Sequence, residues 1–285
     1  MGGSASPYGN VVLITGGNSG IGRATAEAFA ARGFTVYAAS RTPRPAVETF
    51  PGGGSIHPLV MDVTSDDSVV QAVATAVVAE AGPIGILVHS AGIGISGAAV
   101  DMPIEAAHEQ LETNYFGVLR VNSAVIPGMM RAGRGLVVIV SSVAAFFPIP
   151  FQSHYASSKA ALEVYGRSLA MEVASHGIRV ALVQPGDTKT EFTAHRRSAN
   201  VPSSPFYEVC ETSVAKMKHD EETGRSPAVA ARRIVALATS ARPPSRNVVG
   251  ADYQALLLAS RLLPVRLIDR VLRGMYMKPR AGDVG

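Results

Sequence analysis

The stretch TGGNSGIG at residues 15–22 decides how this chain folds. It overlaps the end of the apolar run Val11–Thr15 and precedes the alanine-rich, helix-patterned segment Ala24–Arg32, with Gly33 suited to its C-terminal stop. Glycines after a strand let the backbone approach a pyrophosphate, and the N-terminus of the next helix offers free amides. A tight turn that needs glycine for positive φ is the alternative interpretation. The strand before it and the helix after it favour a nucleotide-binding turn.

The alternation of strand and helix patterns continues along the chain. Almost wholly apolar runs predict strands at Val11–Thr15, Thr35–Ala39, Ile56–Met61, Ile84–His89, Leu136–Ser141, Ile178–Gln184 and Asn247–Val249. The remaining pattern predicts helices at residues 24–32, 66–81, 103–131, 153–175 and 227–240. Strands that are apolar on both faces are typical of a parallel sheet covered by helices. We therefore expect an α/β fold, a single doubly wound Rossmann-type domain over residues 1–285, with a parallel sheet of about seven strands and a flexible leader at 1–9.

Composition supports one packed domain and excludes several classes of protein. Of the 285 residues, 47% are hydrophobic and 17% are charged, which supplies a core and excludes a mostly disordered chain. The one cysteine, Cys210, excludes an intramolecular disulfide and a cysteine-rich metal cage, and predicts a reducing, cytoplasmic compartment. Lys and Arg are scattered, so the net charge of +4 predicts no nucleic-acid binding. No apolar run reaches the roughly 18–20 residues of a membrane-spanning helix. We expect no metal site.

The residues after the second predicted strand indicate which dinucleotide is bound. An acidic side chain there would accept hydrogen bonds from the adenosine ribose and repel a 2′-phosphate. Ser40 and Arg41 stand there instead, and they offer a hydroxyl and a planar guanidinium to a phosphate. Charge-assisted hydrogen bonds contribute about 1.5–3 kcal/mol, so the pair predicts a preference for NADP(H). A solvated surface arginine is the alternative interpretation of Arg41.

Two side chains suited to proton transfer lie one helical turn apart. Tyr155 and Lys159 share a face of the helix predicted at 153–175. A free phenol has a pKa near 10, and a neighbouring cation lowers that pKa by roughly 1–3 pH units, toward the range useful for acid–base catalysis. An exposed Tyr and Lys on a helix face is the alternative. Ser142 favours an active site, because it ends the fifth predicted strand at the carboxyl edge, where ligands bind in such folds.

Together these motifs resemble the short-chain dehydrogenase/reductase family over residues 10–250. The matching positions are the TGxxxGIG motif at 15–22, the YxxxK motif of Tyr155 and Lys159, Ser142, Asn114, Asp62-Val63 and Pro185-Gly186. The segment Val140–Lys159 and the long segment after Pro185-Gly186 most resemble the 17β-hydroxysteroid dehydrogenase branch.

The resemblance implies a role for each residue. Ser142 hydrogen-bonds the substrate carbonyl, Tyr155 transfers the proton, Lys159 lowers the phenol pKa and holds the nicotinamide ribose, and Asn114 positions a water. These four residues are the expected catalytic set. The expected cofactor-binding residues are Gly16, Asn18, Ser19, Gly20, Ile21, Gly22, Ser40, Arg41, Asp62, Val63, Ser90, Ala91, Gly92, Tyr155, Lys159, Pro185, Gly186, Thr188 and Thr190.

The sequence departs from the family after the fourth predicted strand. The usual Asn-Asn-Ala-Gly is His89-Ser90-Ala91-Gly92 here. The Ala-Gly pair, which lets the chain pass close to the cofactor, is kept, and Ser90 replaces an asparagine credited with stabilising the central sheet. His89 suggests a catalytic base as one interpretation. We favour a structural substitution, because Tyr155 already supplies the proton.

The segment Asp187–Ser226 is too long for an ordinary connection and predicts a substrate lid. Within it, Phe206 to Met217 places apolar residues on one helix face, with Ser204 and Pro205 suited to the N-cap and first turn. A face that only packs on the domain is the alternative. With the Phe-rich loop after Ser142, the lid predicts an apolar pocket for a small lipophilic ketone or alcohol. The expected pocket residues are Phe147, Phe151, Phe192, Phe206 and Met217.

The function expected is an NADP(H)-dependent oxidoreductase that interconverts a lipophilic ketone and a secondary alcohol. Reduction of a 3-oxoacyl thioester is an alternative within the same chemistry. A non-catalytic, cofactor-binding regulatory module is an alternative from another class, and the intact Ser, Tyr, Lys and Asn set argues against it.

The tail at 253–277 is rich in leucine and arginine, and after Pro264 it predicts an amphipathic helix. Basic amphipathic helices lie on membrane surfaces in some proteins. Packing on the protein's own body or on a partner subunit is the interpretation we favour here, and we expect a homodimer or homotetramer.

Overall fold

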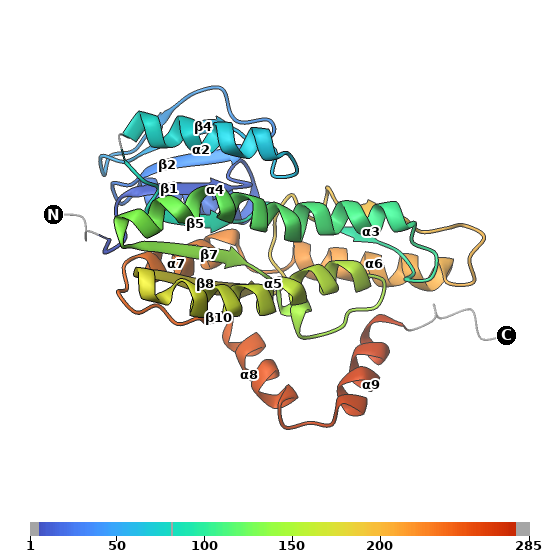
Figure 1. The fold of residues 1–285 in the computed structure, drawn as a ribbon. Coiled ribbons are helices and arrows are strands. Elements are labelled where there is room, and N and C mark those ends of the chain that lie inside the picture. Colours follow the sequence, from blue (N-terminus) through green and yellow to red (C-terminus); the bar gives the residue numbers. More distant parts are fainter. Residues whose placement is uncertain (1–5, 81, 278–285) are drawn as a thin grey trace.

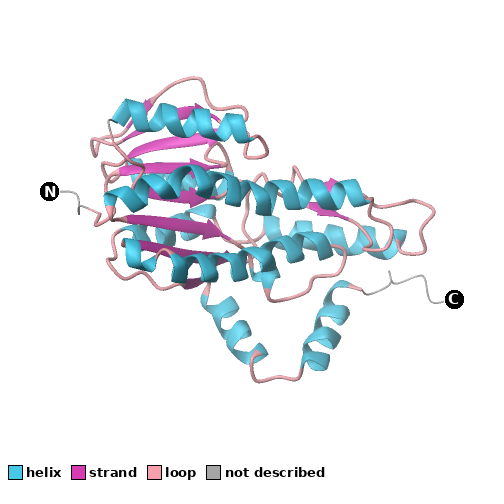
Figure 2. Cartoon of the chain, in the orientation of Figure 1, coloured by secondary structure: helices cyan, strands magenta, loops and turns pink. Residues whose placement is uncertain are grey.

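The computed structural model describes residues 6–80 and 82–277, and it is a doubly wound α/β domain (Figures 1 and 2). Its main sheet has the strand order β10-β8-β7-β5-β1-β2-β4-β3. The strands are β1 (Val11–Thr15), β2 (Thr35–Ser40), β3 (Glu48–Thr49), β4 (Ser55–Val60), β5 (Ile86–His89), β7 (Gly135–Val140), β8 (Ile178–Pro185) and β10 (Arg246–Val249). All but β3 run parallel, as the apolar runs predicted.

The structure also contains short strands that were not predicted, because their sequences carry no clear apolar pattern. Two-residue β3 pairs antiparallel with β4 at the edge. A separate parallel pair joins β6 (Ile95–Ser96) to β9 (Arg197–Ser198). This pair ties the chain after β5 to the segment predicted as a lid, and so it forms part of the wall above the carboxyl edge.

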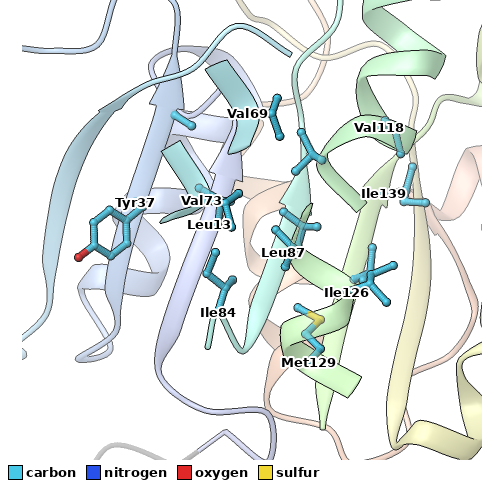
Figure 3. Close-up of a cluster of buried hydrophobic side chains, with 14 of the residues drawn as sticks. Leu13, Tyr37, Val69, Val73, Ile84, Leu87, Val118, Ile126, Met129 and Ile139 are labelled. Carbon is cyan, nitrogen blue, oxygen red and sulfur yellow. The ribbon is translucent and has the colours of Figure 1, made fainter. Parts of the chain in front are cut away.

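Helices cover both faces of the sheet (Figure 1). They are α1 (Gly20–Ala30), α2 (Asp66–Glu80), α3 (Ile104–Leu111), α4 (Gly117–Ala132), α5 (Ser153–Glu172), α6 (Tyr207–Glu222), α7 (Pro227–Ala238), α8 (Ala251–Ser260) and α9 (Val265–Tyr276). Alternate residues of each strand enter opposite cores: Leu13 joins the core under α2, α4 and α5, and Val12 and Ile14 join the core under α1 and α7. Figure 3 shows the first of these cores, where Leu13, Leu87 and Ile139 meet Met129.

The single helix predicted at 103–131 is two helices joined by a π-helical turn at Glu112–Phe116. π-Turns are rare and often occur at functional sites. The expected N-cap of the lid helix is wrong by two residues, because α6 starts at Tyr207 after Phe206. Ser204 instead accepts a hydrogen bond from the Phe206 N–H and donates one to Asp101.

The tail forms two helices rather than one, and it does not pack along the body of the domain. In Figure 1, α8 and α9 extend away from the sheet as a pair. Neither helix buries a residue. The end of α9 returns to α6, where the Lys216 ammonium lies 5.6 Å from the Tyr276 ring centroid, and the start of α8 is tied to the body by the hydrogen bond from Tyr253 to Asp187. Among the described residues, no helix is long and apolar enough to cross a membrane.

Candidate active site

The glycine turn between β1 and α1 is closed so tightly that its glycines cannot be replaced without movement. Gly16 and Gly20 have φ of +66° and +53°, the left-handed region that favours glycine. A Cβ on Gly16 would lie 2.8 Å from the Ala91 backbone, and one on Gly22 would lie 2.2 Å from the Gly16 carbonyl oxygen. This cradle, with the N-terminus of α1 facing into it, fits a pyrophosphate.

The opening of α1 already holds an anionic group from the far side of the site. Glu191 accepts a hydrogen bond from the Gly20 N–H, with Oε2 3.0 Å from N. Thr190 lies beside the same glycine, 3.2 Å from where a Gly20 Cβ would sit. The segment after Pro185-Gly186 therefore lies directly over the glycine turn. Glu191 was not foreseen from the sequence, although its place next to Thr190 was a signal.

The carboxyl ends of β2 and β4 carry the polar groups expected around an adenosine. The Ser40 hydroxyl is buried and has no hydrogen-bond partner among the described residues. Arg41 is exposed next to it. Asp62 accepts hydrogen bonds from the Thr64 N–H and hydroxyl, which hold the pKa of its carboxyl below the usual value, and Arg41 adds to that effect. An orphaned hydroxyl beside a free guanidinium fits a phosphorylated nucleoside.

Lys159 and Tyr155 lie together on α5, as predicted from their spacing. The Lys159 ammonium is buried, donates a hydrogen bond to the Val140 carbonyl at 3.1 Å, and lies 5.8 Å from the Tyr155 ring centroid. Burial lowers the pKa of Lys159 to about 8, and the carboxylate of Glu163 opposes that fall. Glu163 lies one turn further along the same helix, and its Oε2 is buried without a hydrogen bond among the described residues.

The phenol pKa differs from the sequence-based expectation. Burial raises the pKa of Tyr155 to about 12, and a hydrogen bond with Ser142 opposes this. Burial of the phenol dominates its pKa, and the Lys159 ammonium, 5.8 Å from the ring centroid, does not bring that pKa below its usual value. Ser142 caps a short 3-10 turn by accepting the Ala144 N–H at 3.1 Å, which fixes its hydroxyl at the carboxyl end of β7.

Asn114 lies in the π-turn with both side-chain hydrogens already used. Its Nδ2 donates to the Ile93 carbonyl at 3.0 Å and to the Ser158 hydroxyl at 3.1 Å, and its Oδ1 accepts the Ile93 N–H at 2.8 Å. The side chain thus clamps the chain after β5 onto α5. A Cβ on Gly92 would lie 3.2 Å from Asn114 Oδ1 and 3.7 Å from the Lys159 ammonium. The small residue kept at this position is therefore needed for the clamp.

His89 faces the core and not the site. Its Nε2 lies 2.9 Å from Asn122 Oδ1, and Asn122 in turn donates to the Tyr165 hydroxyl at 3.0 Å. Burial lowers the pKa of His89 to about 4, so the ring is neutral near pH 7 and donates its Nε2–H to Asn122. Ser90 reaches β1 through its backbone, by donating its N–H to Thr15.

The predicted pocket residues divide into two groups: Phe192 and Phe147 lie beside the expected active-site residues, and Phe151, Phe206 and Met217 lie in or against α6. Phe192 covers Tyr155, with ring centroids 5.7 Å apart. Phe147 is buried near the serine. Phe151 packs with Ala98 and Cys210 of α6 in a small core, and it has a φ of +63° that bulky residues rarely adopt.

The lid helix uses its apolar face to pack on the domain. Met217 is buried, and its sulfur accepts a hydrogen bond from the Gln152 side chain at 3.1 Å. Phe206 lies at the start of α6 with 37% of its surface exposed, so its place in the pocket stays a prediction. Glu221 of α6 binds both Arg196 and Thr193, and so ties the segment over Tyr155 to the helix. This clamp was not predicted.

The chain is similar in sequence to several known proteins. Residues 10–201 match the sequence pattern described as short chain dehydrogenase. The chain is 35% identical over 93% of its length to 3-ketodihydrosphingosine reductase of Bacteroides thetaiotaomicron, covering 97% of that protein. It is 31% identical over 96% of its length to human retinol dehydrogenase 8, covering 93% of it. It is 37% identical over 65% of its length to the 3-oxoacyl-acyl-carrier-protein reductase of Escherichia coli, covering 76% of it.

Solved structures share the fold. A short-chain dehydrogenase from Streptomyces avermitilis superposes with a TM-score of 0.76 at 29% identity, over 93% of this chain and 98% of that one. One from Burkholderia cenocepacia, in complex with NADP, gives 0.71 at 24% identity over 98% and 100%. One from Burkholderia phymatum, in complex with NAD, gives 0.76 at 19% identity over 98% and 99%.

Proposed function

This chain belongs to the short-chain dehydrogenase family, and we propose that it is an NADP(H)-dependent oxidoreductase that interconverts a lipophilic ketone and a secondary alcohol. One observation carries the proposal: Ser142, Tyr155 and Lys159 meet at the carboxyl edge of the sheet, beside a glycine turn that fits a dinucleotide. A protein without catalytic activity would have no physical need for these three side chains together, which argues against a purely regulatory module.

The proposed chemistry assigns a separate task to each side chain. When bound, the nicotinamide cofactor supplies the hydride to the carbonyl carbon or accepts it in the reverse direction. Ser142 donates a hydrogen bond to the carbonyl oxygen, where negative charge develops. Tyr155 gives that oxygen its proton, and the Lys159 ammonium stabilises the phenolate that remains. Phe192 covers the tyrosine and limits the access of water.

The preference for NADP(H) is supported by Ser40 and Arg41. The unpartnered Ser40 hydroxyl and the exposed guanidinium stand where a 2′-phosphate would lie, and no carboxylate replaces them. Asp62, which follows β4, is expected to lie at the adenine ring and not at the 2′-phosphate. Its carboxylate already accepts a hydrogen bond from the Thr64 N–H. Fluorescence titration with NADPH and NADH tests this preference.

A lipophilic substrate is supported by the apolar residues over the site. Phe192 and Phe147 supply aromatic surface beside the catalytic groups. The names of two relatives give 3-ketodihydrosphingosine and retinol, which are both lipophilic. A hydroxysteroid, as in the 17β-hydroxysteroid dehydrogenase branch, or a long-chain ketone fits the same surface.

A 3-oxoacyl thioester is the second candidate, favoured by 37% identity to the 3-oxoacyl-acyl-carrier-protein reductase. NADPH oxidation against steroids, fatty-chain ketones and acyl thioesters separates the two. The expected result is turnover of the ketones, and turnover of the thioesters alone would replace the first proposal by the second. We further propose a cytoplasmic enzyme, because the single cysteine is buried and free, and a homodimer or homotetramer.

A further inference from the structure

The tail of the molecule exposes large hydrophobic side chains along both of its helices and the turn between them. α9 places Leu267, Ile268, Val271, Leu272 and Met275 on one side and Arg266, Asp269, Arg270 and Arg273 on the other. Leu262 and Val265, in and after the turn between the helices, are 81% and 70% exposed. In Figure 1, α8 runs away from the body and α9 runs back toward it, so that the two helices form an open V. Exposed apolar patches of this kind mark interaction surfaces.

The root of the tail holds a basic cavity next to leucines. A cavity of about 320 Å³ lies between α8, α7 and β10, and Arg233, Arg246 and Arg261 line it together with Leu257 and Leu258. Arg233 binds the Asn247 oxygen, and Arg246 lies over the Phe146 ring at 4.9 Å and 3.8 Å from Glu163. The Arg261 guanidinium has no hydrogen bond or ion pair with the described part of the chain, although its backbone N–H caps α8. Three guanidiniums line this cavity and no carboxylate of the described residues does, which favours an added anion.

The charge on these helices indicates whether the partner of the tail is a lipid surface or a second copy of the chain. α9 carries three arginines against one aspartate, and Asp252 of α8 is already paired with Arg225. A symmetric contact between two copies through the apolar face would leave the arginines on the opposite side of α9 without an anionic partner. An anionic lipid surface offers acyl chains to the leucines and phosphates to the guanidiniums.

We propose that α8 and α9 dock this protein on an anionic lipid surface, with a headgroup phosphate in the cavity lined by Arg233, Arg246 and Arg261. The first turn of α8 is joined to the active-site edge, because the Tyr253 hydroxyl donates to Asp187 at 2.5 Å. Docking therefore holds the site beside the surface. The proposal does not depend on which ketone is reduced.

Sedimentation with vesicles tests the proposal on the full-length protein. The protein is mixed with vesicles of phosphatidylcholine alone, or of phosphatidylcholine with phosphatidylglycerol. The expected result is binding to the second kind that is at least about tenfold tighter and weakens with salt. Inorganic phosphate should not release the protein. Equal binding to both vesicles, or none to either, overturns the proposal.

Matched variants separate docking from folding. The double variant Leu267→Asp with Val271→Asp should weaken vesicle binding by about tenfold or more, because two aliphatic side chains no longer enter the lipid. Val70→Asp with Val78→Asp, at even more exposed positions on α2, should leave it unchanged. Arg261→Glu with Arg270→Glu should abolish the preference for phosphatidylglycerol.

The oligomeric state distinguishes the other occupant of this face. Analytical ultracentrifugation of the double variant of α9 should give the same species as the unchanged protein. If that variant dissociates a dimer while neither protein binds vesicles, a second copy covers the face and the lipid proposal is wrong. If the α9 double variant (Leu267 and Val271) and the α2 control variant (Val70 and Val78) lose vesicle binding equally, the apolar face of α9 has no specific role and the proposal also fails.

Discussion

Glu191 reaches across the glycine turn to Gly20, and its carboxylate accepts the backbone N–H at the start of α1 at 3.0 Å. A free N–H at a helix N-terminus is the group that phosphates use. We therefore predict that the carboxylate and a cofactor phosphate compete for one donor, and that opening of the segment over the site is coupled to cofactor binding.

Removal of this competitor should tighten cofactor binding. Glu191→Ala is expected to lower the Kd for NADPH by about two- to fivefold, the size of a charge effect at a helix terminus. Fluorescence titration measures it, with Glu105→Ala, an exposed glutamate in the first turn of α3, as the control. An unchanged or weaker affinity for NADPH would show that Glu191 does not compete with the phosphate.

Arg41 should select the cofactor. Arg41→Ala is expected to weaken NADPH binding by about ten- to a hundredfold, from a loss of about 1.5–3 kcal/mol, and to leave NADH nearly unchanged. Arg44→Ala, the next exposed arginine, is the control. Equal losses for both cofactors would mean that Arg41 acts through folding.

The pH dependence should follow the charge of Lys159. A lysine is charged below its pKa, which burial lowers to about 8, so kcat/KM for reduction should fall as the pH rises above about 8. Glu163→Gln keeps an acceptor for Gln184 but removes the negative charge that opposes this lowering. The fall should therefore move to lower pH in the variant. A pH profile identical to that of the unchanged enzyme would exclude this role for Glu163.

The lid helix should contribute to stability more than to substrate contact. Met217→Ala is expected to cost about 2–5 kcal/mol of unfolding free energy, as for other buried side chains cut to Ala. Phe206→Ala should cost well under half of that, because its ring is 37% exposed. Denaturant unfolding measures both, and equal losses would show that Phe206 belongs to the core.

Motion of the segment at 187–226 stays a prediction. Limited proteolysis should cut the part before α6 first, and NADPH with substrate should protect it. Cleavage at the same rate with and without ligands would identify this segment as a fixed structural element.

Local patterns allowed much of this to be predicted. The glycine turn, the strands and the pair Tyr155 and Lys159 depend on neighbours in the sequence, so their spacing suffices. The contacts of Glu191 with Gly20, Asn114 with Ile93 and His89 with Asn122 join distant segments, and no local pattern reports them. The prediction that the pKa of the Tyr155 phenol is lowered was wrong for the same reason, because burial depends on the whole fold.

The tail shows the same limit. Its apolar periodicity predicted the helix after Pro264 correctly. Periodicity says which residues share a face but not what that face meets, and in the structure α8 runs away from the body while only the end of α9 returns to α6.

The central claim is that Tyr155 is the proton donor in a ketone reductase. The most direct measurement compares NADPH oxidation by the unchanged enzyme and by Tyr155→Phe, with its best ketone substrate. The account predicts a fall in kcat of about 10²- to 10⁴-fold, typical of a positioned acid–base group, with the Kd for NADPH unchanged. Retention of more than about a tenth of the turnover would contradict it.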